Sequence, residues 1–185
     1  MSLRADDLVI SLDSLQKIYK NKFPKDILLT KKVCLASVKM NGNALHHVPK
    51  ELIDREMCLA SVRRDGGSLE VVPPEFRDRE LCLVAVSEFG DAIESVPYSL
   101  MNKEMCLAAV NQDGWALRYI LTAFKDKEIC LAAITQNGLS LIHVPDKLKT
   151  RELCLLAVKD DPDARHYVPY DLRKEIENAL YMDSL

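Results

Sequence analysis

Six cysteines separated by a constant interval of 24 residues constrain the fold more than any other feature of this chain. They are Cys34, Cys58, Cys82, Cys106, Cys130 and Cys154. Neither disulfide nor metal chemistry requires a constant interval, whereas self-similarity with a period of 20–50 residues is typical of repeat proteins. The sequence therefore predicts one structural unit repeated about six times within 185 residues.

The cysteines themselves are not expected to bind metal or to form disulfides. Equivalent positions of stacked helices lie about 8–10 Å apart, whereas a disulfide needs Cα atoms within about 7 Å. The chain has no CxxC and no paired histidines at ligand spacing, so zinc is not expected either. Each cysteine lies in an apolar string such as MCLA at 57–60. We predict free, buried thiols, no cofactor, and a reducing compartment.

The first half of each unit has the pattern of a helix of about three turns. A good N-cap residue stands four positions before each cysteine, a basic residue follows it, and a glutamate usually comes next, where the helix dipole favours an acid. Six apolar or small positions follow, which predicts a helix buried between neighbours on both sides. A glycine eight residues after the cysteine suits a left-handed position that ends the helix. The caps are Thr30, Asp54, Asp78, Asn102, Asp126 and Thr150, and the glycines are Gly42, Gly66, Gly90, Gly114 and Gly138.

The second half of the unit predicts a short helix followed by a turn. Its pattern is Ala-Leu-x-x-Val-Pro-x-x-Leu, as at 44–52, and proline forces the preceding valine into an extended conformation. No stretch alternates with period 2, so strands are not expected. We therefore predict an all-α fold, a right-handed α-solenoid of about six helix–turn–short-helix repeats. The recurring Arg-Glu pairs, such as Arg55-Glu56, predict a structural ladder between stacked helices rather than a catalytic site.

Both ends of the chain depart from the repeat and are expected to be caps, because terminal units of a solenoid need a polar outer face. An apolar stripe, Leu8, Leu12, Leu15 and Ile18, predicts a helix from about 6 to 20. We divide the chain into an N-terminal capping helix (1–22), the tandem repeats (23–177) and a C-terminal cap end and tail (178–185).

The unit resembles a family of tandem helical repeats known only as a domain of unknown function. The resemblance rests on motifs such as KEMCLAAV at 103–110, followed by Gly114 and Leu117, and it covers roughly residues 24–178. In that family the units recur in bacterial and viral proteins, including secreted effectors of intracellular bacteria. A more distant likeness is to leucine-rich variant repeats. The resemblance implies a fold, and no catalytic residue can be carried over from it.

Composition excludes several classes of function. The formal net charge of −3 and the pI near 5.8 disfavour a general binder of nucleic acids or membrane surfaces. No run approaches the roughly 20 apolar residues of a membrane helix, and the N-terminus has no signal-peptide pattern. We expect a cytoplasmic protein, with secretion as an effector through a signal-free route as the alternative.

Function is expected at positions that vary between units, because packing positions repeat and recognition positions do not. Units four and five carry an unusual aromatic and aliphatic group: Trp115, Tyr119, Leu139, Ile142 and His143. Aromatic residues of this kind are favoured in protein interfaces. The alternative is that Trp115 fills a gap left where Leu121 replaces the recurring proline. The early units are basic at Lys39, Arg63 and Arg64, which suits an acidic partner or a phosphate if the charges are not simply solvated.

The leading hypothesis is a non-enzymatic module that binds another protein, with a bacterial effector or neutralising protein as its family-based version. A single-stranded RNA reader would need stacking aromatics and a basic stripe in most units, which this chain lacks. An enzyme with an unrecognised site is the remaining alternative, because no nucleophile–base pair, phosphate loop or carboxylate pair is evident.

Overall fold

The computed structural model describes residues 31–183, and over this range the chain is all-α and has no β-strand. The predicted helix at 6–20 and the cap Thr30 lie outside the described residues. The α-helices are α3 (Lys31–Met40), α4 (Arg55–Arg64), α5 (Arg79–Glu88), α6 (Lys103–Gln112), α7 (Lys127–Gln136), α8 (Arg151–Asp160) and α9 (Tyr170–Asp183). Between them lie the 3₁₀-helices η2 (Gly42–His47), η3 (Lys50–Leu52), η4 (Gly66–Val71), η5 (Pro74–Phe76), η6 (Gly90–Ser95), η7 (Gly114–Tyr119), η8 (Gly138–His143), η9 (Asp146–Leu148) and η10 (Pro162–Tyr167).

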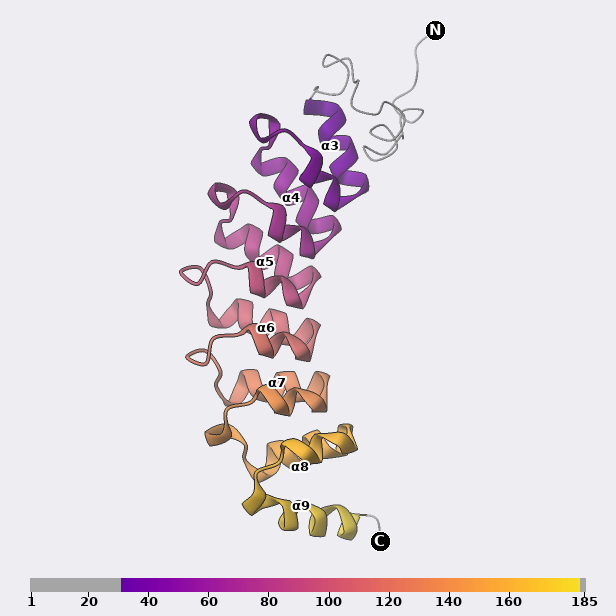
Figure 1. Cartoon of the computed structure of the whole chain (residues 1–185), viewed down its shortest axis with the longest axis vertical. Helices are drawn as coiled ribbons and strands as arrows, with labels where there is room; N and C mark the ends of the chain where they lie inside the picture. Colours follow the sequence, from indigo (N-terminus) through magenta and orange to yellow (C-terminus); the bar gives the residue numbers. More distant parts are fainter. Residues whose placement is uncertain (1–30, 184–185) are drawn as a thin grey trace.

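The units stack into an elongated column in which α3 to α9 follow one another along the long axis (Figure 1). Each α-helix packs against the next α-helix. The 3₁₀-helices η2, η4, η6, η7 and η8 each pack against the α-helix before them and the one after them, whereas η10 packs against α8. The six-residue 3₁₀-helices also pack against each other. The described chain is therefore a two-layer solenoid of helical repeats, as the sequence predicts.

The predicted caps start the helices α4 to α8. The Asp54 carboxylate accepts a hydrogen bond from the backbone N–H of Met57 at 2.8 Å, and the Thr150 hydroxyl accepts one from Leu153 at 3.4 Å. The three intervening caps do the same for their own helices. These bonds satisfy N–H groups that have no partner inside the helix.

The recurring glycines serve a different purpose from the predicted one. None of the described glycines has a left-handed backbone; each α-helix ends instead at an extended residue such as Asp113 (φ −147°, ψ 117°), whose side chain caps the following 3₁₀-helix. A β-carbon at any of the five repeat glycines would lie 2.3–2.6 Å from a backbone carbonyl oxygen of the next unit. Glycine is needed here because two units approach too closely for any side chain.

The cysteines lie in the core, as predicted. None of the six forms a disulfide, and their side chains are at most 1% exposed. Burial raises the pKa of Cys58 to about 11, because a thiolate is poorly solvated among apolar neighbours. Burial is also the main reason that the pKa of Cys106 rises to about 11.

A ladder of ion pairs joins the N-terminal ends of successive α-helices. Arg55 at the start of α4 binds Asp78 at 2.9 Å and Glu80 at 2.6 Å, both at the start of α5. Lys103 binds Asp126 and Glu128 in the same way, each at 2.6 Å, and its hydrogen bond keeps the pKa of Asp126 below the ordinary value. The basic residues at the starts of α3, α5, α7 and α8 also pair with the next helix. The predicted ladder is confirmed, with each pair joining two units.

The last helix departs from the repeat. The 24-residue period would start a helix at 175, whereas α9 begins at Tyr170, directly after Pro169. It is 14 residues long and runs without a break across the expected boundary between 177 and 178. Its buried apolar residue is Ile176, which is 2% exposed.

Candidate protein-interaction surface

The predicted aromatic group, which we call the η7–η8 cluster (Trp115, Tyr119, Leu139, Ile142 and His143), is brought together by the stacking of η7 on η8. The rings of Trp115 and His143 meet edge to face, with centroids 5.4 Å apart and planes at 68°. Trp115 is half-buried by this contact. Tyr119 and Leu139 pack against the core, and Ile142 is the exposed member, at 42%.

Charged side chains also contact members of the η7–η8 cluster. The Arg118 guanidinium lies 4.5 Å from the centre of the Tyr119 ring and pairs with Asp91 of the preceding unit. Lys125 donates to the backbone oxygen of His143 at 3.1 Å. Burial, together with Lys125 and Arg118, lowers the pKa of His143, so its imidazole is neutral at pH 7. Much of the apolar surface of this cluster is therefore used inside the chain.

The predicted basic residues also find partners within the chain. Lys39 lies 3.3 Å from the Glu56 carboxylate, and Arg64 donates through Nε to the carbonyl oxygen of Met40 at 3.2 Å. Arg63 is exposed and has no ion-pair partner among residues 31–183. The three residues come from the last turns of α3 and α4, where Lys39 and Arg64 are already engaged by groups of this chain.

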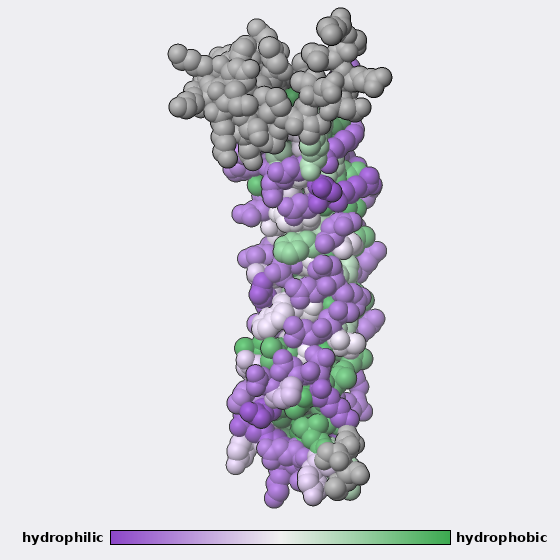
Figure 2. All heavy atoms as spheres, turned by 90° about the vertical axis from the view of Figure 1, so that its right-hand side faces the viewer, coloured by the Kyte–Doolittle hydropathy of each residue, from purple (hydrophilic) through white to green (hydrophobic). Residues whose placement is uncertain are grey.

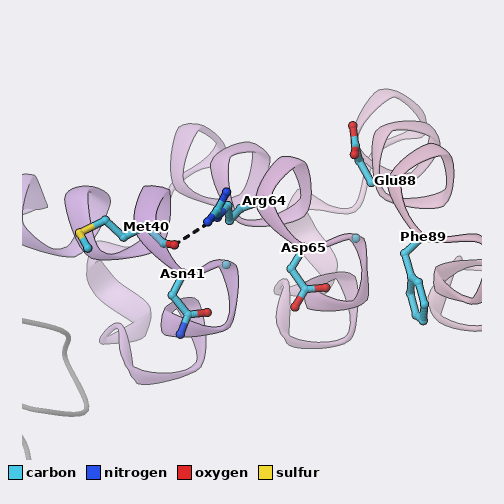
Figure 3. A pocket seen from close by; sticks show the side chains of 8 residues that line it. Met40, Asn41, Arg64, Asp65, Glu88 and Phe89 are labelled. Atoms are coloured by element: carbon cyan, nitrogen blue, oxygen red, sulfur yellow. Dashed lines mark hydrogen bonds between the residues drawn. The ribbon is translucent and has the colours of Figure 1, made fainter.

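A shallow pocket of about 540 Å³ lies beside Arg64, at the C-terminal ends of α3, α4 and α5 (Figure 3). Asp65 and Glu88 line it together with the exposed ring of Phe89. Two carboxylates beside one guanidinium make this pocket a poor site for phosphate, because the anions would repel each other.

An apolar surface that the sequence interpretation missed runs along the α-layer. The two residues after each cysteine are a leucine and a small or apolar residue, and all twelve are partly exposed or exposed. Leu131 is 41% exposed and Leu156 is 37% exposed. We call this surface the outer Leu–Ala stripe: Leu35, Ala36, Leu59, Ala60, Leu83, Val84, Leu107, Ala108, Leu131, Ala132, Leu155 and Leu156.

Helical spacing explains the exposure of this stripe and corrects the expectation that these helices are buried all round. Leu59 lies four residues after Arg55 and four residues before Arg63, and residues at that spacing share one face of a helix. Arg55 and Arg63 are both exposed, and Leu59 between them is partly exposed and also packs against the core, so Leu59 lies where the buried face meets the solvent-facing one. The ionic ladder borders the stripe on one side, and the polar last turns of the helices border it on the other.

Figure 2 shows one side on which hydrophilic side chains predominate and hydrophobic side chains form small, separate groups. Among residues 31–183, no helix has the length and apolar content needed to cross a membrane. Contiguous apolar surface bordered by polar residues is typical of interaction sites.

The fold and its surfaces define a repeat protein of the α-solenoid class. The chain belongs to the family described as Domain of unknown function (DUF4116), whose family model matches residues 30–77, 78–125 and 126–173. Each match spans two of the 24-residue units and begins at a residue that the sequence predicts to be a helix cap, Thr30, Asp78 or Asp126. No curated protein and no solved structure matches this chain.

Proposed function

We propose that this chain is a non-enzymatic module that binds another protein through the outer Leu–Ala stripe. The observation that supports this proposal is the continuity of the stripe: the same two helix positions are apolar and at least partly exposed in all six units. A single exposed leucine is ordinary on a protein surface. Nine of the twelve residues are partly buried and also pack against the core, and Ala36, Leu131 and Leu156 are the exposed members. In register they form a narrow, elongated surface that suits a partner with an extended apolar face.

The chemistry of the described residues supports a binding role over a catalytic one. The cysteines are the only strong nucleophiles that recur, and burial raises the pKa of each thiol, which disfavours the reactive thiolate. No group of three or more His, Cys, Asp or Glu side chains within residues 31–183 could hold a metal ion. A binding role for single-stranded RNA has little support, because most of the cations at the helix starts are paired with carboxylates in the ladder.

The thiols and the family resemblance support a proposal for the cellular setting of this role. Six cysteines without a disulfide fit a reducing compartment such as the cytoplasm. A bacterial effector or a neutralising protein that acts on a partner is the version of the proposal that the family resemblance favours. The proposed binding surface depends neither on this compartment nor on this family-based role.

Affinity capture followed by mass spectrometry tests the proposal. Wild-type chain and the double variant Leu131→Glu/Leu156→Glu are used as baits in parallel, with Gln136→Glu, which adds a charge at an exposed site on α7, as the matched control. Circular dichroism verifies that all three chains are folded. We expect partners that are captured by the wild type and the control to be lost with the double variant. Equal capture by all three baits would show that the stripe is not the binding surface.

A second pair of baits separates the stripe from the η7–η8 cluster. Trp115→Ala and Tyr119→Ala remove two aromatic members of that cluster and leave the stripe intact. We expect both variants to capture the same partners as the wild type. Loss of partners with these variants alone would transfer the role to the η7–η8 cluster.

A further inference from the structure

The junction between η10 and α9 is built differently from the five junctions before it. In those five, a glycine allows the next unit to approach within contact distance of the backbone. At the sixth, Pro162 occupies the glycine position and carries a ring. The helix α9 packs against α8 and makes little contact with η10. At this junction, therefore, the last α-helix and the last six-residue 3₁₀-helix are not packed against each other.

A groove of about 690 Å³ lies in this junction. Its floor is apolar and comes from α8, η10 and α9: Val158, Val168, Ile176 and Leu180. Val158, Val168 and Ile176 are 6% exposed or less, and Leu180 is partly exposed, so each of the first three side chains contributes little accessible surface to the floor. Grooves of this volume accept a ligand or a few side chains of a peptide.

The rim of the groove is predominantly basic. Four cationic or titratable side chains line it, against one carboxylate, that of Glu177. They are Lys159, Arg165, His166 and Arg173. Asp160, Asp161 and Asp163 follow Lys159 in the sequence but do not line the groove. Asp160 accepts a hydrogen bond from the backbone N–H of Gly138 at 2.7 Å, and Asp161 accepts one from that of Asp163 at 2.8 Å.

Arg173 is the residue that most clearly indicates an anionic ligand. A cation ends each 48-residue family unit: Arg77, Lys125 and Arg173. Arg77 donates to three carbonyl oxygens, those of Val72 and Glu70 in its own unit and that of Ser95 in the next unit. Lys125 likewise donates to His143 of the next unit. Interior cations of this series are thus covered by the following 3₁₀-helix.

Arg173 has the same hydrogen bond to its own unit as Arg77, but it lacks the contact with a following 3₁₀-helix. Its Nε donates to the carbonyl oxygen of Val168 at 3.1 Å, as Nε of Arg77 does to Val72. Its two terminal nitrogens have no hydrogen-bond partner among residues 31–183, although they belong to a side chain that lines the groove. An anchored guanidinium with two free nitrogens matches the geometry of a carboxylate, which it binds with two parallel hydrogen bonds.

We propose that this groove, the C-terminal groove, binds an acidic amphipathic peptide segment of a partner protein, with a carboxylate on Arg173 and apolar side chains on the floor. The open groove and its cationic rim favour a peptide with several carboxylates over a lipid chain, which needs a deeper, enclosed apolar cavity. The site is separate from the outer Leu–Ala stripe and goes beyond the function proposed for it.

Fluorescence anisotropy with the full chain tests the proposal. The probe is a labelled helical peptide with leucines on one face and glutamates on the other, and the control peptide carries glutamine in place of every glutamate. We expect the glutamate peptide to bind, its affinity to fall with added salt, and Arg173→Gln and Arg165→Gln each to weaken binding at least about tenfold. Arg165 is exposed and makes no side-chain hydrogen bond within residues 31–183, so Arg165→Gln serves where Arg173→Gln disturbs the fold.

Controls make the result specific. Arg63→Gln removes an exposed, unpaired cation far along the column and should bind the peptide within about twofold of the wild type. Leu131→Glu should also bind normally, which separates this site from the outer Leu–Ala stripe. Two results would overturn the proposal: no binding at millimolar peptide, or equal binding by both groove variants and the wild type. The chain is also mixed with vesicles that contain phosphatidylserine, and binding to these vesicles without binding to the peptide would likewise overturn it.

Discussion

Gly114 lies so close to the carbonyl oxygen of Ala133, in the next unit, that a β-carbon on Gly114 would be 2.4 Å from that oxygen. The same relationship recurs at every junction from α3 to α8. It sets the spacing of the two layers, because the start of each six-residue 3₁₀-helix rests directly on the backbone of the following α-helix.

We therefore expect Gly114→Ala to destabilise the fold by about 2–3 kcal/mol, as overpacking against a rigid backbone does. The matched control is Gly67→Ala. A β-carbon on Gly67 would lie 3.2 Å from a side-chain oxygen of Asp65 and 3.6 Å from the ring of Phe89, and both groups can shift. Urea unfolding of the three chains measures the difference. Equal losses for both variants would mean that the close backbone approach does not limit position 114.

The buried thiols should be inert in the folded protein. The pKa of Cys82 and that of Cys130 rise to about 11 because of burial, so almost no thiolate exists at pH 7.5. Titration with a coloured disulfide reagent should detect no fast-reacting thiol in the native chain and six per chain in guanidinium chloride. A fast-reacting thiol in the native chain would indicate local opening at that unit.

Acidification should weaken the fold through His143. Burial, followed by Lys125 and Arg118, lowers the pKa of His143 below its ordinary value of 6.5. The unfolded chain therefore binds a proton more readily than the folded chain, and stability falls as pH decreases below 6.5. His143→Gln should reduce the loss of stability between pH 7 and pH 5. Identical pH profiles for the wild type and His143→Gln would refute this coupling.

The ionic ladder should contribute a salt-dependent share of the stability. Arg55 binds two carboxylates of the next helix, Asp78 and Glu80, and exposed pairs of this kind are screened by salt. Arg55→Gln should lower the melting temperature modestly at low salt and have a smaller effect in 0.5 M salt. Arg63→Gln, which removes an exposed cation outside the ladder, should show neither effect. A salt-independent loss for Arg55→Gln would point to packing by its aliphatic stem.

Much of the fold could be predicted from the sequence because most of its determinants act within one unit. The cap Asp54 and the proline Pro49 shape only their immediate neighbours, and the extended Val48 (φ −77°, ψ 130°) follows from the proline after it. The burial of the cysteines follows from apolar strings of constant length. Each of these features recurs together with the residues that cause it, so each unit supports the interpretation of the others.

Features that depend on two units were not predictable in the same way. The role of the glycines needs the position of a carbonyl 19 residues further along the chain, as between Gly114 and Ala133. Arg77 and Arg173 have equivalent places and different surroundings, because only Arg77 is covered by a following 3₁₀-helix. The exposure of Leu131 could have been found from its spacing to Lys127 and Thr135, which lie on the same helix face.

The packing contacts among the described elements join neighbouring units, and this has a mechanical consequence. A column built in this way has no long-range contact that closes it, so its units resemble links of a chain that detach successively. Pulling on the two ends should extend the protein in a series of small steps instead of one rupture. Adding or deleting a 48-residue pair should change the length of the column and leave the remaining junctions as they are.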